Sequence, residues 1–120
     1  MKAALLILLL AVTPAWASDD IGPKLDIGKG GHCVDDPKFM RINHMVMLLR
    51  QRDETMRLGI RGGKYSLAAC VECHASKKNN SVLGSSENFC QGCHEYAKVR
   101  IDCFECHSSK RKVITEAANE

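Results

Sequence analysis

Hydrophobic residues recur at helical spacing in one long stretch of the chain. Between positions 37 and 58 they recur on one side of a helix, as Phe39, Ile42, Met45, Val46 and Leu49. Asp35-Asp36-Pro37 precedes this stretch and is typical of a helix start, because Asp36 can cap the first backbone amides and proline suits the first helical position. Gly59 is a suitable end. The pattern therefore predicts one long helix from Pro37 to Leu58.

The other segments show little regular patterning. Residues 18–36 combine glycine and proline with charges and predict an extended, irregular arm. Residues 61–64 predict a loop, and residues 75–86 are small, polar and basic. No alternating run of strand character occurs. The pattern thus favours a mostly α and irregular fold, with one long helix and few or no strands.

The N-terminus has the pattern of an export signal. Met1-Lys2 is followed by an apolar run from Ala3 to Val12, and the segment ends in Ala15-Trp16-Ala17. A positive start, a short apolar core and an A-x-A ending predict a secretory signal peptide over residues 1–17. The alternative is a retained N-terminal membrane anchor, although the run is short for a transmembrane helix, which needs about 20 apolar residues. Residues 18–120 would form one exported domain.

Three copies of one short motif lie between positions 70 and 107. They are Cys70-Val-Glu-Cys73-His74, Cys90-Gln-Gly-Cys93-His94 and Cys103-Phe-Glu-Cys106-His107. C-x-x-C-H is the attachment motif of c-type haem. Its two thiols can add to the vinyl groups on one porphyrin edge, and the histidine that follows can ligate the iron. We therefore expect three covalent haems, with His74, His94 and His107 as proximal ligands.

Covalent haems would also explain the composition. After residue 17 the chain has few aromatic residues, namely Phe39, Phe89, Phe104, Tyr65 and Tyr96, and a polypeptide core this thin is marginal alone. We thus expect a small multihaem cytochrome c with a haem-filled core. The formal charge of +3 would be offset by haem propionates, so it does not indicate nucleic-acid binding. Basic residues that are candidates to pair with propionates, or to be simply solvated, are Arg50, Arg52, Arg57, Arg61 and Lys64.

A four-cysteine zinc ribbon is the main alternative to the haem interpretation. Cys70, Cys73, Cys90 and Cys93 match its spacing. A zinc ribbon leaves the third cysteine pair and all three adjacent histidines unexplained, and it fits poorly with an exported chain. The haem interpretation is therefore favoured.

The sixth ligands of the three irons cannot all be histidine. Only His32 and His44 remain after the motifs are counted, so at least one iron must have another ligand or an open position. His44 lies mid-helix beside Met45, with Met40 one turn earlier on the same face, so either methionine is a candidate. Cys33, the one cysteine outside the motifs, is a further candidate. As a thiolate ligand it would lower the reduction potential of the haem iron relative to histidine or methionine. His32 is its neighbour and competitor.

Nearly all of the chain after the signal segment resembles DsrJ, the triheme cytochrome c subunit of the DsrMKJOP membrane complex of sulfur-metabolising prokaryotes. The likeness rests on Gly31-His32-Cys33-Val34, residues 39–45, residues 52–55, residues 59–61, Tyr65-Ser66-Leu67 and the motifs that follow. It implies one bis-histidine, one histidine/methionine and one histidine/cysteine haem. On that pattern Cys33 is the thiolate ligand, His44 the distal histidine, and Met45 or Met40 the methionine. His32 is not part of the pattern.

The resemblance also implies a place and partners. The protein would lie on the periplasmic side of the cytoplasmic membrane, held there by the complex or by an uncleaved signal peptide. Its partners would be subunits resembling DsrM, DsrK, DsrO and DsrP. The leading hypothesis is an electron-transfer subunit of dissimilatory sulfur metabolism rather than an enzyme by itself. The alternatives are direct turnover of a sulfur compound at a Cys33-ligated haem, or a stand-alone soluble electron shuttle.

Overall fold

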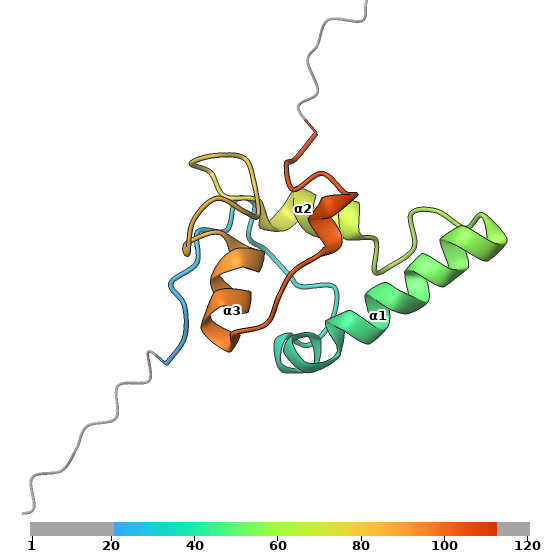
Figure 1. Cartoon of the computed structure of the whole chain (residues 1–120), viewed down its shortest axis with the longest axis horizontal. Coiled ribbons are helices and arrows are strands. Elements are labelled where there is room, and N and C mark those ends of the chain that lie inside the picture. The colour runs from blue at the N-terminus through green and yellow to red at the C-terminus, as the bar shows by residue number, and fades with distance from the viewer. Residues whose placement is uncertain (1–20, 113–120) are drawn as a thin grey trace, which may run out of the picture.

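The computed structural model describes residues 21–112 (Figure 1). Its elements are the helices α1 (Pro37–Leu58), α2 (Leu67–His74) and α3 (Phe89–Ala97), followed by the short 3-10 helix η1 (Cys103–Glu105). The described residues contain no β-strand, only two isolated bridges that join Asp26 to Asn88 and Ser81 to Lys110. The mostly helical, irregular fold predicted from the sequence is confirmed. The predicted signal segment lies outside the described residues.

Local signals set both ends of α1. At the start, Asp36 Oδ1 accepts hydrogen bonds from the backbone amides of Lys38 at 3.0 Å and Phe39 at 2.9 Å. At the end, Gly59 adopts the left-handed conformation with φ of 69°, and its amide donates to the carbonyl of Thr55. Glycine is favoured there because it has no Cβ to clash in this conformation. The predicted helix from Pro37 to Leu58 is confirmed at both ends.

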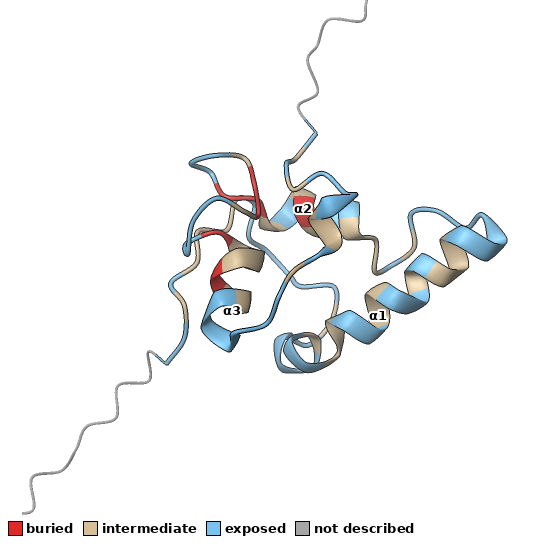
Figure 2. Ribbon diagram, in the orientation of Figure 1, coloured by how far each residue is buried: buried red, intermediate tan, exposed pale blue. Residues whose placement is uncertain are grey.

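α1 lies to one side of α2 and α3 (Figure 1) and contains no buried residue. Apolar side chains on its outer face are largely exposed, including Ile42 at 80% and Met56 at 78% (Figure 2). The face toward the rest of the chain is half-buried and carries Met40, His44 and Met47. The polypeptide alone therefore packs α1 sparsely, as expected for a fold built around cofactors. No helix in the described part of the chain is long and apolar enough to cross a membrane.

The best-packed region surrounds the loop between α2 and α3. Val71, Ala75 and Val82 are its buried apolar side chains, with Leu83, Cys90 and Phe104 packed against them (Figure 2). The N-terminal arm crosses this region, where the Asp26 amide donates to the carbonyl of Glu87 at 2.9 Å. The arm predicted to be irregular is thus fixed by long-range backbone contacts.

The C-terminal part of the described chain closes over the same region. The amide of Val82 donates to the carbonyl of Ser109 at 2.9 Å, and the amide of Arg111 donates to the carbonyl of Asn80 at 3.0 Å. The Arg111 guanidinium also donates to the carbonyl of Ala75 at 3.0 Å. Residues 109–112 therefore hold the end of α2 against the loop that follows it.

Candidate haem-attachment site

Each C-x-x-C-H motif lies on a helical turn. α2 carries Cys70 and Cys73 and ends at His74, while α3 carries the second motif close to its start. The third motif begins η1, where the amide of His107 donates to the carbonyl of Cys103 at 3.0 Å. Residues three apart on a helical turn lie on the same side. Each pair of thiols can therefore reach one edge of a single porphyrin.

The motifs converge around Cys90. Burial and, to a smaller extent, the nearby thiols of Cys70, Cys103 and Cys93 together raise the pKa of the Cys90 thiol to about 12, because a second negative charge would be repelled. The first cysteine of the second motif therefore lies within electrostatic range of the first cysteines of the other two. None of the seven cysteines forms a disulfide.

The second motif faces α1. The imidazole rings of His44 on α1 and His94 on α3 have centroids 6.0 Å apart, with ring planes at 75°. His44 Nδ1 donates to the carbonyl of Met40 at 3.0 Å, which leaves Nε2 free as a ligand. Arg41, one turn before, lies near Cys93, where it opposes the rise in that thiol's pKa that burial causes. α1 thus brings the predicted distal histidine to a predicted proximal one.

The first motif has two neighbours. The ring of Phe89 stacks on the imidazole of His74, with centroids 3.8 Å apart and planes at 25°. Burial lowers the pKa of His74. Burial also raises the pKa of Cys70, with smaller contributions from Cys73 and Cys33, so Cys33 lies close to the first motif.

The structure places the other predicted ligands as follows. Cys33 and His32 are exposed, at the end of the arm just before α1. Met45 is 46% exposed on the outer face of α1, whereas Met40 is half-buried on the same side as His44. Within residues 21–112, no three His, Cys, Asp or Glu side chains are grouped so as to bind a metal ion by themselves. Cys70, Cys73, Cys90 and Cys93 accordingly do not form the closed four-ligand cluster of a zinc ribbon.

The residues present fit c-type haem. The Nδ1 atoms of His74 and His94 are buried and have no hydrogen-bond partner among the described residues, so neither ring is engaged in a polar network of the chain itself. A bond from a metal to imidazole nitrogen is about 2 Å, and the ring centre lies about 1 Å beyond, so two imidazoles on one iron have centroids about 6 Å apart. The separation of the His44 and His94 rings matches this span.

Two polar clusters around the motifs were not predicted from the sequence. Asp35 Oδ2 accepts hydrogen bonds from Lys64 Nζ and Tyr65 Oη, both at 2.9 Å, and these bonds join the segment after Cys33 to the loop before the first motif. Glu72, inside that motif, accepts from the amide of Lys112 at 2.7 Å and lies 3.7 Å from Lys29 Nζ. Both clusters tie distant segments to the first motif, and sequence spacing alone gives no sign of either.

Several basic residues considered as propionate partners form ion pairs within the chain. Arg50 lies 3.4 Å from Glu54, Arg52 lies 2.9 Å from Asp53, and Lys64 binds Asp35. These pairs are largely exposed, and such pairs contribute at most about 1 kcal/mol. The pairing of these residues with propionates therefore stays a prediction.

Comparison with known proteins gives one informative match. The chain is 38% identical over 80 residues to the Hdr-like menaquinol oxidoreductase cytochrome c subunit of Archaeoglobus fulgidus. The aligned stretch is 64% of this chain and 56% of that subunit, so the chain spans little more than half the length of its relative. No family model matches the chain. No solved structure matches it either.

Proposed function

We propose that this chain is a triheme c-type cytochrome that relays electrons as a subunit of a membrane redox complex. The observation that carries this proposal is the convergence of three C-x-x-C-H motifs on one small region, with Cys90 close to both Cys70 and Cys103. Bound at these motifs, haem supplies reversible one-electron chemistry at its iron. Attachment points this close together would hold three such centres near one another, as rapid relay requires.

In this proposal each part of the chain holds the centres in a different way. The six motif cysteines form the thioether bonds, and His74, His94 and His107 are the proximal ligands. His44 is the sixth ligand opposite His94, supported by the 6.0 Å separation of the rings. Cys33 is the sixth ligand at the first motif, supported by its closeness to Cys70. Met45, or Met40, is the remaining sixth ligand.

The proposed partners follow from two likenesses. The Archaeoglobus fulgidus relative is named as the cytochrome c subunit of a menaquinol oxidoreductase, and the sequence resembles DsrJ. We therefore place the chain on the periplasmic side of the cytoplasmic membrane, beside subunits resembling DsrM, DsrK, DsrO and DsrP. Electrons would come from, or return to, a menaquinone pool in dissimilatory sulfur metabolism.

Reduction within the intact complex tests the electron-transfer function. The complex is purified with the wild-type chain or with His44→Ala, and the haem absorbance is followed after a menaquinol analogue is added. We expect rapid reduction of all three haems in the wild type and incomplete or slowed reduction in the variant. The proposal would be wrong if dithionite reduces the haems of the wild-type complex but the quinol does not.

Catalysis at Cys33 is a second candidate function. The Cys33 side chain is exposed and lies near the first motif, so a small sulfur compound could reach it. Turnover of such a compound by the wild-type complex that disappears in Cys33→Ala, with three haems still attached, would support catalysis. Equal turnover by both proteins would leave electron transfer as the only role.

A further inference from the structure

The His74 ring is held in an unusual way for a metal-ligating histidine. Such a histidine almost always donates its second ring nitrogen to a carbonyl, a carboxylate or water, and this hydrogen bond fixes the orientation of the ring. His44 follows this rule, since its Nδ1 donates to the carbonyl of Met40. His74 does not, because its Nδ1 is buried and has no partner among the described residues. Another contact must therefore fix the plane of the His74 imidazole.

Phe89 provides that contact. Its ring lies nearly parallel to the imidazole of His74, at 3.8 Å between centroids. A face-to-face contact at this distance blocks rotation of the imidazole about its bond to Cβ, while the edge of the ring with its nitrogens stays accessible. His94 in the second motif, whose Nδ1 also lacks a partner among the described residues, is held differently, because its ring meets that of His44 edge to face. A parallel aromatic partner is thus specific to the first motif.

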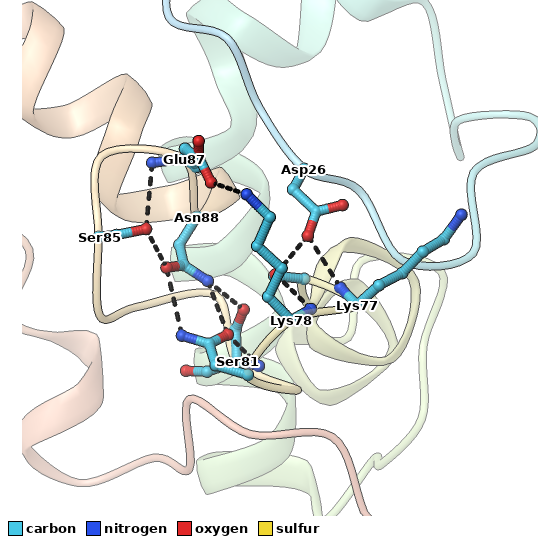
Figure 3. A network of polar contacts seen from close by, with 9 residues as sticks. Asp26, Lys77, Lys78, Ser81, Ser85, Glu87 and Asn88 are labelled. Atoms are coloured by element: carbon cyan, nitrogen blue, oxygen red, sulfur yellow. Dashed lines mark hydrogen bonds and ion pairs between the residues drawn. The ribbon is translucent and has the colours of Figure 1, made fainter.

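The position of Phe89 is itself fixed. Phe89 is the first residue of α3, directly after the buried Asn88. Asn88 Nδ2 donates to Asn79 Oδ1 at 2.9 Å and to the carbonyl of Ser81 at 2.7 Å (Figure 3). Asn88 Oδ1 accepts from Ser85 Oγ at 2.9 Å. The loop from α2 to α3 is therefore a rigid spacer. It begins after His74 in the first motif and places Phe89, at its far end, against His74 again.

The arm strengthens this spacer from its other side. The Asp26 carboxylate accepts hydrogen bonds from Ser76 Oγ at 2.5 Å and from the amide of Lys77 at 3.1 Å (Figure 3). Ser76 and Lys77 lie just after the first motif. The amide of Asp26 donates to the carbonyl of Glu87, just before Asn88. Lys78 forms an ion pair with Glu87 across the same loop. Both ends of the loop are thus tied to each other and to the arm.

We propose that Phe89, anchored by the Asn88 network, is a positioning residue that sets the plane of the His74 imidazole at the first haem. This inference rests on the proposed function, since it needs a haem at the first motif. With haem bound at the first motif, a contact that orients the ligating His74 ring would tune the spectrum and the potential of that centre. Phe89 thereby links the geometry of the second motif to the properties of the first.

Electron paramagnetic resonance of the oxidised full-length protein tests the proposal. Phe89→Leu removes the flat ring while keeping an apolar side chain, and Phe89→Tyr keeps the ring. The matched control is Tyr96→Leu, because Tyr96 lies on the same helix as Phe89 but is 60% exposed and stacks on no histidine in the described part of the chain. We expect Phe89→Leu to shift the g-values of one low-spin species, and Phe89→Tyr and Tyr96→Leu to leave that species unchanged.

Haem count separates the possible failures. Fewer than three covalent haems in the wild type would contradict the proposed function. Three haems in Phe89→Leu with an unshifted spectrum would overturn the positioning role alone. If Phe89→Leu fails to mature, the reduced, diamagnetic wild-type protein is measured instead. A nuclear Overhauser effect between the rings of Phe89 and His74 supports the stack, and its absence overturns it.

Discussion

Asn88→Ala should destabilise the protein strongly, because Asn88 is 1% exposed and its side chain joins three parts of one loop. The substitution removes two donated hydrogen bonds, to Asn79 and Ser81, and two accepted ones, from Ser85 Oγ and, at 3.4 Å, from Asn79 Nδ2. Each such bond contributes about 0.5–1.5 kcal/mol net. The acceptors are not orphaned, since the Ser81 carbonyl still accepts from the amide of Ser76, and Asn79 Oδ1 still accepts from the amide of Ser81. We therefore expect a loss of about 2–4 kcal/mol.

This loss is large compared with the stability of a small domain, which is about 5–15 kcal/mol. It is measured as the change in free energy of unfolding in guanidinium chloride, followed by circular dichroism at equal haem loading. For a domain of this size the loss corresponds to a fall in Tm of at least about 8 °C.

Asn43→Ala is the matched control. Asn43 lies on α1 and its side chain donates only to the carbonyl of Phe39, one turn earlier in the same helix. Its loss should change stability by less than about 0.5 kcal/mol, partly because alanine favours the helix. If Asn88→Ala costs under about 1 kcal/mol, or no more than Asn43→Ala, the loop is not the rigid spacer described above.

Three further predictions concern the arm and α1. Gly28→Ala should cost about 1–3 kcal/mol of stability in the same unfolding assay, since the added Cβ would lie 2.1 Å from the carbonyl oxygen of Ala75; a neutral result would mean that the arm is not seated there. The hydrogen bond from Ser76 holds the pKa of Asp26 below its usual value of about 3.9. The ionised Asp26 carboxylate therefore stabilises the fold at pH values above its unfolded-state pKa, and this stabilisation is lost as the pH falls through the lower pKa of the folded state. The difference in free energy of unfolding between wild type and Asp26→Asn should thus shrink in acid, and a difference that stays constant with pH would contradict this. His44→Ala should convert one low-spin ferric haem to a high-spin or differently ligated form in electron paramagnetic resonance, whereas Asn43→Ala should not; an unchanged His44→Ala spectrum would remove His44 as a ligand.

The sequence predicted α1 well because its limits depend on neighbouring residues. Asp36, Pro37 and Gly59 act through caps and backbone conformation within one turn of the helix ends. Such signals are readable from a single chain. The three motifs are equally local, since five consecutive residues define each of them.

The arrangement around the motifs could not be predicted in the same way. The stack of Phe89 on His74 joins residues fifteen positions apart through a loop whose sequence is mainly small, polar and basic and predicts no particular path. Asn88 occupies the N-cap position of α3, yet its side chain makes no cap hydrogen bond and is buried in a network that extends back to Asn79. The contact between His44 and His94 depends on where α1 lies, which no local pattern determines. Residue spacing identifies candidates, but tertiary contacts decide which of them meet.

The central claim is that the three motifs each bind a covalent haem. Its most direct test is the mass of the full-length protein under denaturing conditions, after expression with a cytochrome c maturation system. The wild type should carry the added mass of three haems, and Cys103→Ala/Cys106→Ala should carry two. A wild-type mass with fewer than three haems, or cysteines that remain free for alkylation in the denatured protein at any motif, would contradict the claim.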